Sequence, residues 1–218
     1  MDFKKSRHIF FDFDGTVIDT GKGVKNGVKY ALEHYGFKIP DTSVLNGFMG
    51  PPLSSSFPGY YGLTAEQTED AIRVYREYYS SKGVYEFELY PGIENLLKTL
   101  RDHGRDLFIA STKPEKFVKL IMADAGLDKY FRFIGGATLD GSMEDKPDII
   151  NYVLANNSDL DRSSSVMIGD RKFDINGAKI CGLPSIAVLY GYGSREELEE
   201  AGADAFASST GELLDLLI

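Results

Sequence analysis

The sequence lacks the features that mark several classes of protein. Its single cysteine, Cys181, cannot form an internal disulfide bond. No stretch approaches the roughly 18 consecutive apolar residues of a membrane-spanning helix, and no leading apolar run predicts a signal peptide. We therefore expect a cytoplasmic protein without a membrane partner.

Basic residues are also scarce, because 24 Lys and Arg face 33 Asp and Glu, for a net charge of −9. Nucleic-acid binding depends on basic groups that neutralise phosphates, so we expect no nucleic-acid partner. An anionic substrate would need local positive charge or a metal ion. With 218 residues, 43% of them apolar, the chain can build one large domain or a domain with a smaller companion. This composition allows a monomer or a weak homo-oligomer.

Short apolar runs that end in Gly, Asp, Ser or Thr alternate with helical patterns along most of the chain. The clearest runs cover residues 8–11, 107–110, 166–168 and 185–189, with weaker candidates at 131–134 and 205–206. Strands that alternate with helices are typical of a parallel sheet covered on both faces. The sequence therefore predicts an α/β fold with a Rossmann-like, doubly wound parallel sheet.

One connection is far longer than the others. Roughly 90 residues separate Thr16 from the strand near Leu107, whereas strand-to-helix loops normally have a few residues. Helical patterns occupy residues 23–35 and 64–82 of this stretch, and the second begins with a capping box at Thr64 and Gln67. We predict an α/β core of residues 1–16 and 92–218, with an inserted helical subdomain of residues 17–91.

Two carboxylates mark the end of the first predicted strand. Asp12 and Asp14 follow the apolar run, and side chains two residues apart on a strand share a face. Both would point into the crevice at the carboxyl end of the sheet, where open α/β folds bind ligands. Two such acids repel each other, so a metal ion or a shared proton is expected between them. The alternative is a pair that merely ends the strand before Gly15.

The segment Asp12-Phe13-Asp14-Gly15-Thr16 resembles the first signature of the haloacid dehalogenase-like (HAD) phosphohydrolases. Three later segments resemble the other signatures of that family: a Ser ending the next core strand, a Lys opening a helix, and an acidic cluster after an apolar strand. The matching residues are Asp12, Asp14, Ser111, Lys146, Asp170 and Asp174. Each later residue alone is also typical of a helix cap, a surface charge or an exposed helix face. Their order and their placement at strand ends favour the resemblance.

The resemblance implies a Mg²⁺-dependent phosphatase that hydrolyses a small phosphate ester. Asp12 would be the nucleophile and would form an aspartyl-phosphate intermediate. Asp14 would give a proton to the leaving alcohol and later take one from water. Lys146 would neutralise the phosphoryl group, and Ser111 with Thr112 would contact its oxygens.

The resemblance also implies the ligands of the metal ion. They would be a carboxylate oxygen of Asp12, the main-chain carbonyl of Asp14 and the carboxylate of Asp170, together with phosphate and water. Asp174 would orient a metal-bound water or Lys146 rather than bind the metal directly.

In this family, an insertion after the first strand is a mobile helical cap that excludes water and selects the substrate. Residues 47–53 resemble the recognition loop of phosphoglycolate phosphatase-like members and, more narrowly, of a bacterial 5′-nucleotidase branch. Phe48 or Met49 would contact the leaving group; alternatively both belong to the core of the cap. Three lysines, Lys22, Lys25 and Lys113, are candidates for further contacts with an anion, but we favour solvated surface charges for them.

Other functions use similar residues. A phosphomutase of the same fold would return the phosphoryl group to a sugar. A phospho-receiver module also phosphorylates an Asp, but its chain would have no large insert and would keep its phosphoryl group. A dehalogenase is less favoured, because its chemistry has no use for Asp14 or for a metal at Asp170.

Overall fold

The computed structural model describes residues 2–218 and divides into two compact units. The first, here called the core unit, contains the chain up to Ile18 together with Leu89–Ile218. The second, the helical unit, contains Asp19–Glu88. Two short strands, β2 (Ile18–Asp19) and β3 (Glu88–Leu89), pair with each other where the chain passes between the units.

The core unit contains a six-stranded sheet in which all paired strands are parallel. Its order is β5-β4-β1-β6-β7-β8. The strands are β1 (His8–Phe11), β4 (Asp106–Pro114), β5 (Phe133–Ala137), β6 (Ser165–Gly169), β7 (Ser185–Val188) and β8 (Ala205–Ala207). The predicted α/β fold with a doubly wound parallel sheet is confirmed.

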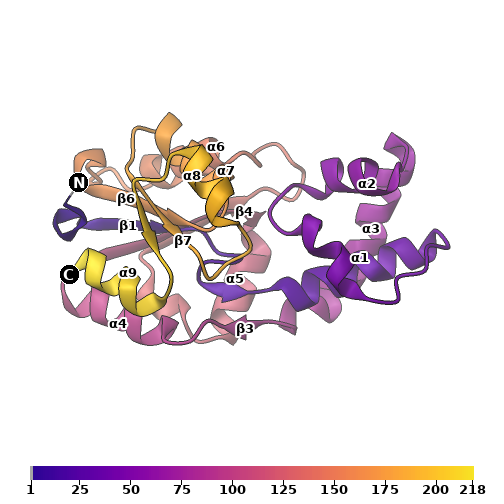
Figure 1. The fold of residues 1–218 in the computed structure, drawn as a ribbon, viewed down its shortest axis with the longest axis horizontal. Coiled ribbons are helices and arrows are strands. Elements are labelled where there is room, and N and C mark those ends of the chain that lie inside the picture. The colour runs from indigo at the N-terminus through magenta and orange to yellow at the C-terminus, as the bar shows by residue number, and fades with distance from the viewer. Residues whose placement is uncertain (1) are drawn as a thin grey trace. The chain divides into compact units, whose positions relative to one another are not determined.

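Helices cover both faces of this sheet. Figure 1 shows α6, α7 and α8 on one face and α4, α5 and α9 on the other. Their bounds are α4 (Ile93–Asp102), α5 (Glu115–Asp124), α6 (Lys146–Ala155), α7 (Lys172–Ile180), α8 (Arg195–Ala201) and α9 (Thr210–Leu217). Phe10 and Met167 of the sheet pack with Ile150 of α6 in one buried apolar cluster. Burial on both faces explains why the central strands are almost entirely apolar.

The order of the strands places one edge of the sheet at a switch point. From β1 the chain adds β4 and β5 on one side, and then β6, β7 and β8 on the other. Phe11, the last residue of β1, lies opposite Ile109 of β4 and Ile168 of β6. The carboxyl end of β1 therefore has a strand end on each side, which is where open α/β sheets bind ligands.

The helical unit is built from α1 (Gly21–His34), α2 (Leu53–Tyr61) and α3 (Ala65–Ser81). The capping box predicted for α3 is present: Gln67 N–H donates to Thr64 Oγ1 at 3.2 Å, and Thr64 N–H donates to Gln67 Oε1 at 2.9 Å. This helix ends at Ser81, and a 3₁₀ turn, Gly83–Tyr85, follows it.

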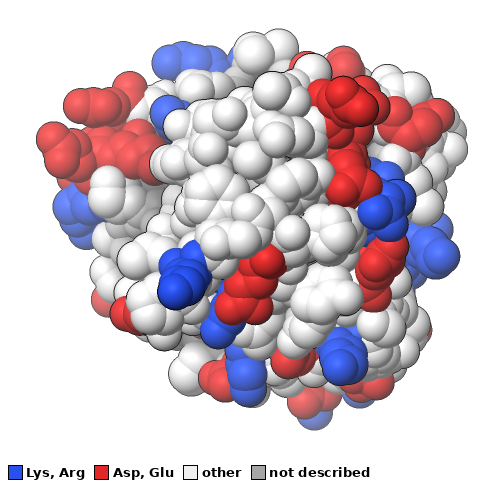
Figure 2. All heavy atoms as spheres, turned by 90° about the vertical axis from the view of Figure 1, so that its right-hand side faces the viewer, with Lys and Arg blue, Asp and Glu red and all other residues white. Residues whose placement is uncertain are grey.

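The surface carries both signs of charge. On the face drawn in Figure 2, acidic and basic groups of the described residues are scattered around uncharged surface. Among residues 2–218, no helix is both long enough and apolar enough to cross a membrane.

Candidate active site

Asp12 lies just beyond the carboxyl end of β1 and is largely buried. Its N–H donates to the carbonyl of Ile168 at 2.8 Å, which continues the pairing with β6. Its Oδ1 accepts a hydrogen bond from Lys146 Nζ at 2.7 Å. Because a buried carboxylate and a buried ammonium are each costly alone, this ion pair stabilises both charges.

Lys146 is the first residue of α6, and its ammonium connects three parts of the core unit. Besides Asp12, its Nζ lies 2.7 Å from Asp174 Oδ1 and donates to the carbonyl of Ala110 at 2.9 Å. Burial alone would lower the pKa of Lys146, but the two carboxylates raise that pKa above its ordinary value. The lysine therefore stays charged at the point where β1, β4 and α7 meet.

Three buried carboxylates gather at this point. Oxygens of Asp12, Asp170 and Asp174 all lie within 4.8 Å of one another. Asp170 is fully buried; its Oδ1 accepts from Thr16 Oγ1 at 3.2 Å and its Oδ2 from Tyr192 N–H at 2.7 Å. Burial, reinforced by the neighbouring carboxylates, raises the pKa of Asp170 well above its ordinary value. The set of three carboxylates therefore carries more negative charge than its buried surroundings accommodate easily.

The donor set fits a divalent metal ion. Two of the three carboxylates, Asp12 and Asp174, pair with the buried ammonium of Lys146, and carboxylate oxygens are ligands that Mg²⁺ prefers. Asp174 also serves its neighbours, because Oδ1 pairs with Lys146 and Oδ2 accepts from Arg171 N–H at 3.0 Å. Orientation of Lys146 by Asp174 is one of the two functions expected from the sequence. Which oxygens bind a metal stays a prediction.

We expect the Asp174 carboxyl to make the stability of the metal-free protein depend on pH. Burial and the Asp12 carboxylate raise the pKa of Asp174 from 3.8 to about 6. The folded protein therefore binds this proton more tightly than the unfolded chain, so the stabilisation is present below about pH 4 and is lost as the pH rises through about 6. In the wild type this carboxyl should lower the free energy of unfolding by on the order of 3 kcal/mol over that window. Asp174→Asn has no carboxyl at this position and should not show this decrease.

Urea unfolding in the presence of a chelator, at pH 4 and pH 7, measures this difference. The exposed Asp102→Asn is the matched control and should retain the pH dependence of the wild type. Identical pH dependence in the wild type and Asp174→Asn would contradict the expectation.

The second aspartate of the first motif faces a different lysine. Asp14 accepts from Lys113 Nζ at 3.0 Å through Oδ1 and at 3.2 Å through Oδ2. Lys113 is only 8% exposed, so the expectation of a solvated surface charge is wrong. The signal was present in the sequence, because Lys113 stands two residues after Ser111, the spacing at which extended residues share a face.

Ser111 is buried near the end of β4, and its Oγ accepts from Lys113 N–H at 3.2 Å. It directly follows Ala110, whose carbonyl holds Lys146, so the strand brings the hydroxyl to the same edge of the sheet. Thr112 beside it is half-buried. Contact of Ser111 and Thr112 with a phosphoryl group stays a prediction.

A loop after β7, residues 190–194, packs against the acidic group, and sequence reasoning missed it. Tyr192 supplies the N–H to Asp170, and two glycines allow the close approach. A Cβ on Gly191 would lie 2.3 Å from the carbonyl oxygen of Gly15, and a Cβ on Gly193 would lie 1.9 Å from that of Asp170. The alternation of Tyr and Gly in this loop is the signal that could have indicated it.

Gly193→Ala should destabilise the protein, because the new methyl group overlaps the backbone of Asp170. We expect a loss of at least about 2 kcal/mol in the free energy of unfolding, measured by urea titration. Gly211→Ala, where the nearest atom to a new Cβ is 3.7 Å away, is the matched control. Equal stability of the two variants would show that the loop is not packed as described.

Asp170 is followed by Arg171 and Lys172, whereas the signature that this segment resembles more often has a small polar residue there. The guanidinium of Arg171 pairs with Glu197 of α8, with Nε 2.8 Å from Oε1. The same oxygen accepts from Lys172 N–H at 2.9 Å. These contacts tie the start of α7 to α8.

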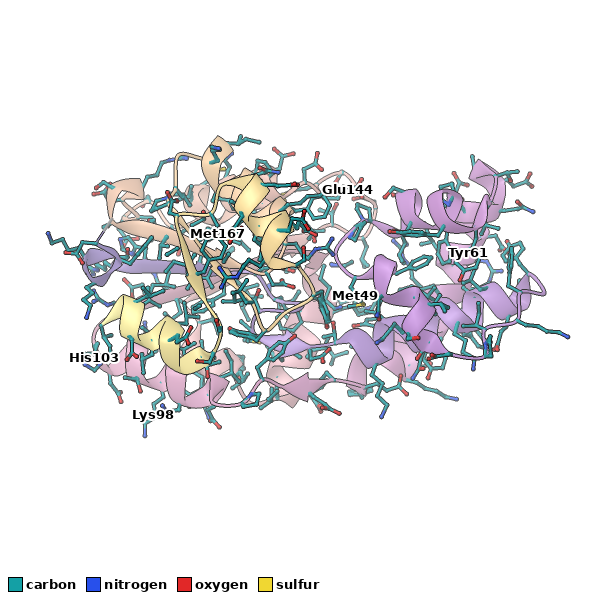
Figure 3. All side chains as sticks on the ribbon, in the orientation of Figure 1. Met49, Tyr61, Lys98, His103, Glu144 and Met167 are labelled. Carbon is teal, nitrogen blue, oxygen red and sulfur yellow. The ribbon has the colours of Figure 1, made fainter. Side chains whose placement is uncertain are left out.

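In the helical unit, Phe48 is buried among aromatic rings. Its ring centroid lies 5.3 Å from that of Phe57, 5.4 Å from that of Tyr60 and 6.1 Å from that of Tyr61. Met49 is buried as well, and Figure 3 labels it together with Tyr61. This packing corresponds to the alternative interpretation, a core position. Contact of Phe48 with a substrate stays a prediction.

A model of the haloacid dehalogenase-like hydrolase family matches residues 9–188. The chain belongs to this family. The match begins in β1 and ends in β7, so it includes the buried acidic group and the helical unit. The resemblance found in the sequence motifs is confirmed.

The curated relatives of this chain include proteins with three different names. A 5′-nucleotidase from Pseudomonas aeruginosa is 37% identical over 191 residues, covering 88% of this chain and 86% of the relative. The tyrosine-protein kinase PtkA from Mycobacterium tuberculosis is 33% identical over 211 residues, covering 96% and 72%. A phosphoglycolate phosphatase from Vibrio parahaemolyticus is 26% identical over 217 residues, covering 96% and 95%.

A solved structure resembles the whole chain. The crystal structure of a predicted phosphatase from Clostridium acetobutylicum has a TM-score of 0.92 and 41% identity, covering 96% of this chain and 97% of that one. The chain is therefore a member of a hydrolase family, and several proteins similar to it are named phosphatases. HAD phosphatases generally use a divalent metal ion, which the buried acidic group fits.

Proposed function

We propose that the protein is a Mg²⁺-dependent phosphatase that hydrolyses a small phosphomonoester through an aspartyl phosphate on Asp12. The proposal rests on one observation: Asp12 lies against the ammonium of Lys146 and within a buried group of three carboxylates. Among substrates, we favour nucleoside 5′-monophosphates over phosphoglycolate, because the relative named 5′-nucleotidase is 37% identical and the one named phosphoglycolate phosphatase 26%.

Charge neutralisation comes first, because the negative charge of a phosphomonoester repels nucleophiles. The Lys146 ammonium lies 2.7 Å from the Asp12 carboxylate and would attract a phosphoryl oxygen beside it. Ser111 would donate its hydroxyl to another phosphoryl oxygen. Mg²⁺, held by Asp12, the Asp14 carbonyl and Asp170, would supply the remaining positive charge.

Asp12 and Asp14 would then carry out the chemical steps. A carboxylate oxygen of Asp12 attacks phosphorus, the bond to the ester oxygen breaks, and Asp14 gives its proton to the leaving alcohol. Water next attacks the phosphorus of the acyl phosphate while Asp14 takes a proton from it. Inorganic phosphate leaves, and both carboxyl groups return to their starting states.

Phosphate release from a panel of nucleoside 5′-monophosphates, phosphoglycolate and sugar phosphates, with Mg²⁺ or with chelator, tests the proposal. We expect release from at least one small ester and its loss on chelation. No release from any ester, or release indifferent to chelator, would reject the assignment. An isomerised sugar phosphate would favour a phosphomutase, and a long-lived phosphorylated protein a receiver module.

A further inference from the structure

A second lysine at the site has no part in the steps above. We propose that Lys113 is a positioning residue that holds the carboxyl group of Asp14 where it exchanges a proton with the leaving group. This inference rests on the proposed function, because it assigns Lys113 to the proton-transfer step of that reaction.

The contact between the two side chains fixes the orientation of the carboxylate. Lys113 Nζ lies 3.0 Å from Oδ1 and 3.2 Å from Oδ2 of Asp14, so it engages both oxygens. The lysine side chain is 6% exposed and that of Asp14 is 20% exposed. An ammonium is rarely enclosed without an anionic partner, and here the ionised carboxylate of Asp14 is that partner. When Asp14 carries the proton that it donates, its other oxygen can still accept from Lys113.

The backbone that carries Lys113 is itself held in place. β4 loses its regular register with β5 between Ser111 and Pro114. Within this irregular stretch, Lys113 N–H donates to Ser111 Oγ at 3.2 Å. Gly136 of β5 packs so closely that a Cβ there would lie 2.7 Å from the carbonyl oxygen of Lys113. The backbone of Lys113 is therefore held in place, as precise positioning of a functional group requires.

Asp14 needs such a partner more than Asp12 does. Asp12 continues the hydrogen bonding of the sheet, whereas Asp14 lies further out, directly before a turn in which Gly15 has a φ of +86°. Lys146 is paired with the nucleophile Asp12, and Lys113 with the proton donor Asp14. Each of the two aspartates that carry out the proposed chemistry thus has its own lysine partner.

This assignment predicts an effect that depends on the leaving group. A proton from Asp14 matters most when the leaving group is a poor one, such as the alkoxide of a nucleoside or of glycolate. Nitrophenolate departs without a proton. A substitution that misplaces Asp14 should therefore slow the hydrolysis of an alkyl phosphate far more than that of p-nitrophenyl phosphate.

The test compares Lys113→Met and Lys113→Arg with the wild type. The measured quantity is kcat/KM, which reports the step in which the ester bond breaks, on the best alkyl phosphate and on p-nitrophenyl phosphate. We expect Lys113→Met to lose about 10²-fold on the alkyl ester and less than about fivefold on the aryl ester. Lys113→Arg should recover most of the loss, because a guanidinium also donates to both oxygens. Lys116→Met, exposed on α5, should match the wild type on both esters.

Equal losses on the two esters would overturn the inference, because Lys113 would then act on the transferred phosphoryl group. Unchanged activity of Lys113→Met would overturn it too. Either result would leave the phosphatase assignment intact. A wild-type protein that hydrolyses neither ester would instead refute the proposed function, and the inference with it. Urea unfolding of each variant checks that the fold is retained.

Discussion

Asp12→Asn should lower kcat for ester hydrolysis at least about 10⁴-fold, because an amide cannot form the acyl phosphate. The substitution is nearly isosteric, and its carbonyl oxygen can still accept from Lys146. That lysine also keeps its contacts with Asp174 at 2.7 Å and with the carbonyl of Ala110 at 2.9 Å. We therefore expect the free energy of unfolding to stay within about 2 kcal/mol of the wild type.

Phosphate release under saturating ester, with urea unfolding of the same preparation, measures both expectations. Asp102→Asn makes the same chemical change on an exposed part of α4 and should leave kcat unchanged. A folded Asp12→Asn protein with kcat within about tenfold of the wild type would exclude Asp12 as the nucleophile.

Lys146→Met should have the largest effect on stability. The substitution keeps an unbranched chain of similar length but removes the ammonium shared by Asp12 and Asp174. Breaking a buried ion pair by removing one partner leaves uncompensated charge, so we expect a loss of about 3–5 kcal/mol in chelator. Loss of the charge that faces the phosphoryl group should also lower kcat by about 10²–10³-fold.

Mg²⁺ gives this prediction a second measurement. Because the variant leaves the carboxylates without their ammonium, Mg²⁺ should stabilise it against urea more than it stabilises the wild type. Lys98→Met is the matched control, since Figure 3 shows Lys98 on the exposed side of α4. A Lys146→Met protein as stable and as active as this control would contradict the described site.

The positions of the main site residues could be predicted because they follow from simple geometry. Apolar runs identified β1 and β6, and the carboxyl ends of neighbouring parallel strands lie at one edge of the sheet. Asp12 and Asp170 stand directly beyond β1 and β6, and Lys146 opens α6. The family motifs added the order in which to look for them.

Contacts between distant segments could not be read in the same way. Lys113 looked like a surface charge. Its spacing from Ser111 indicates a shared face, but it does not show that Asp14, 99 positions away, accepts from its ammonium. Gly193 is ordinary in sequence, and only the packing of its loop against Asp170 explains it. Phe48 lies in a segment that resembles a recognition loop, yet its ring is packed among other aromatic rings.

The most direct test of the account is to trap the phosphorylated enzyme. The protein would be mixed with a hydrolysed ester and Mg²⁺, quenched in acid within one turnover, reduced with borohydride and analysed by peptide mass spectrometry. Borohydride converts an aspartyl phosphate to homoserine, and the account predicts homoserine at position 12. Modification at another residue, or none during active turnover, would contradict it.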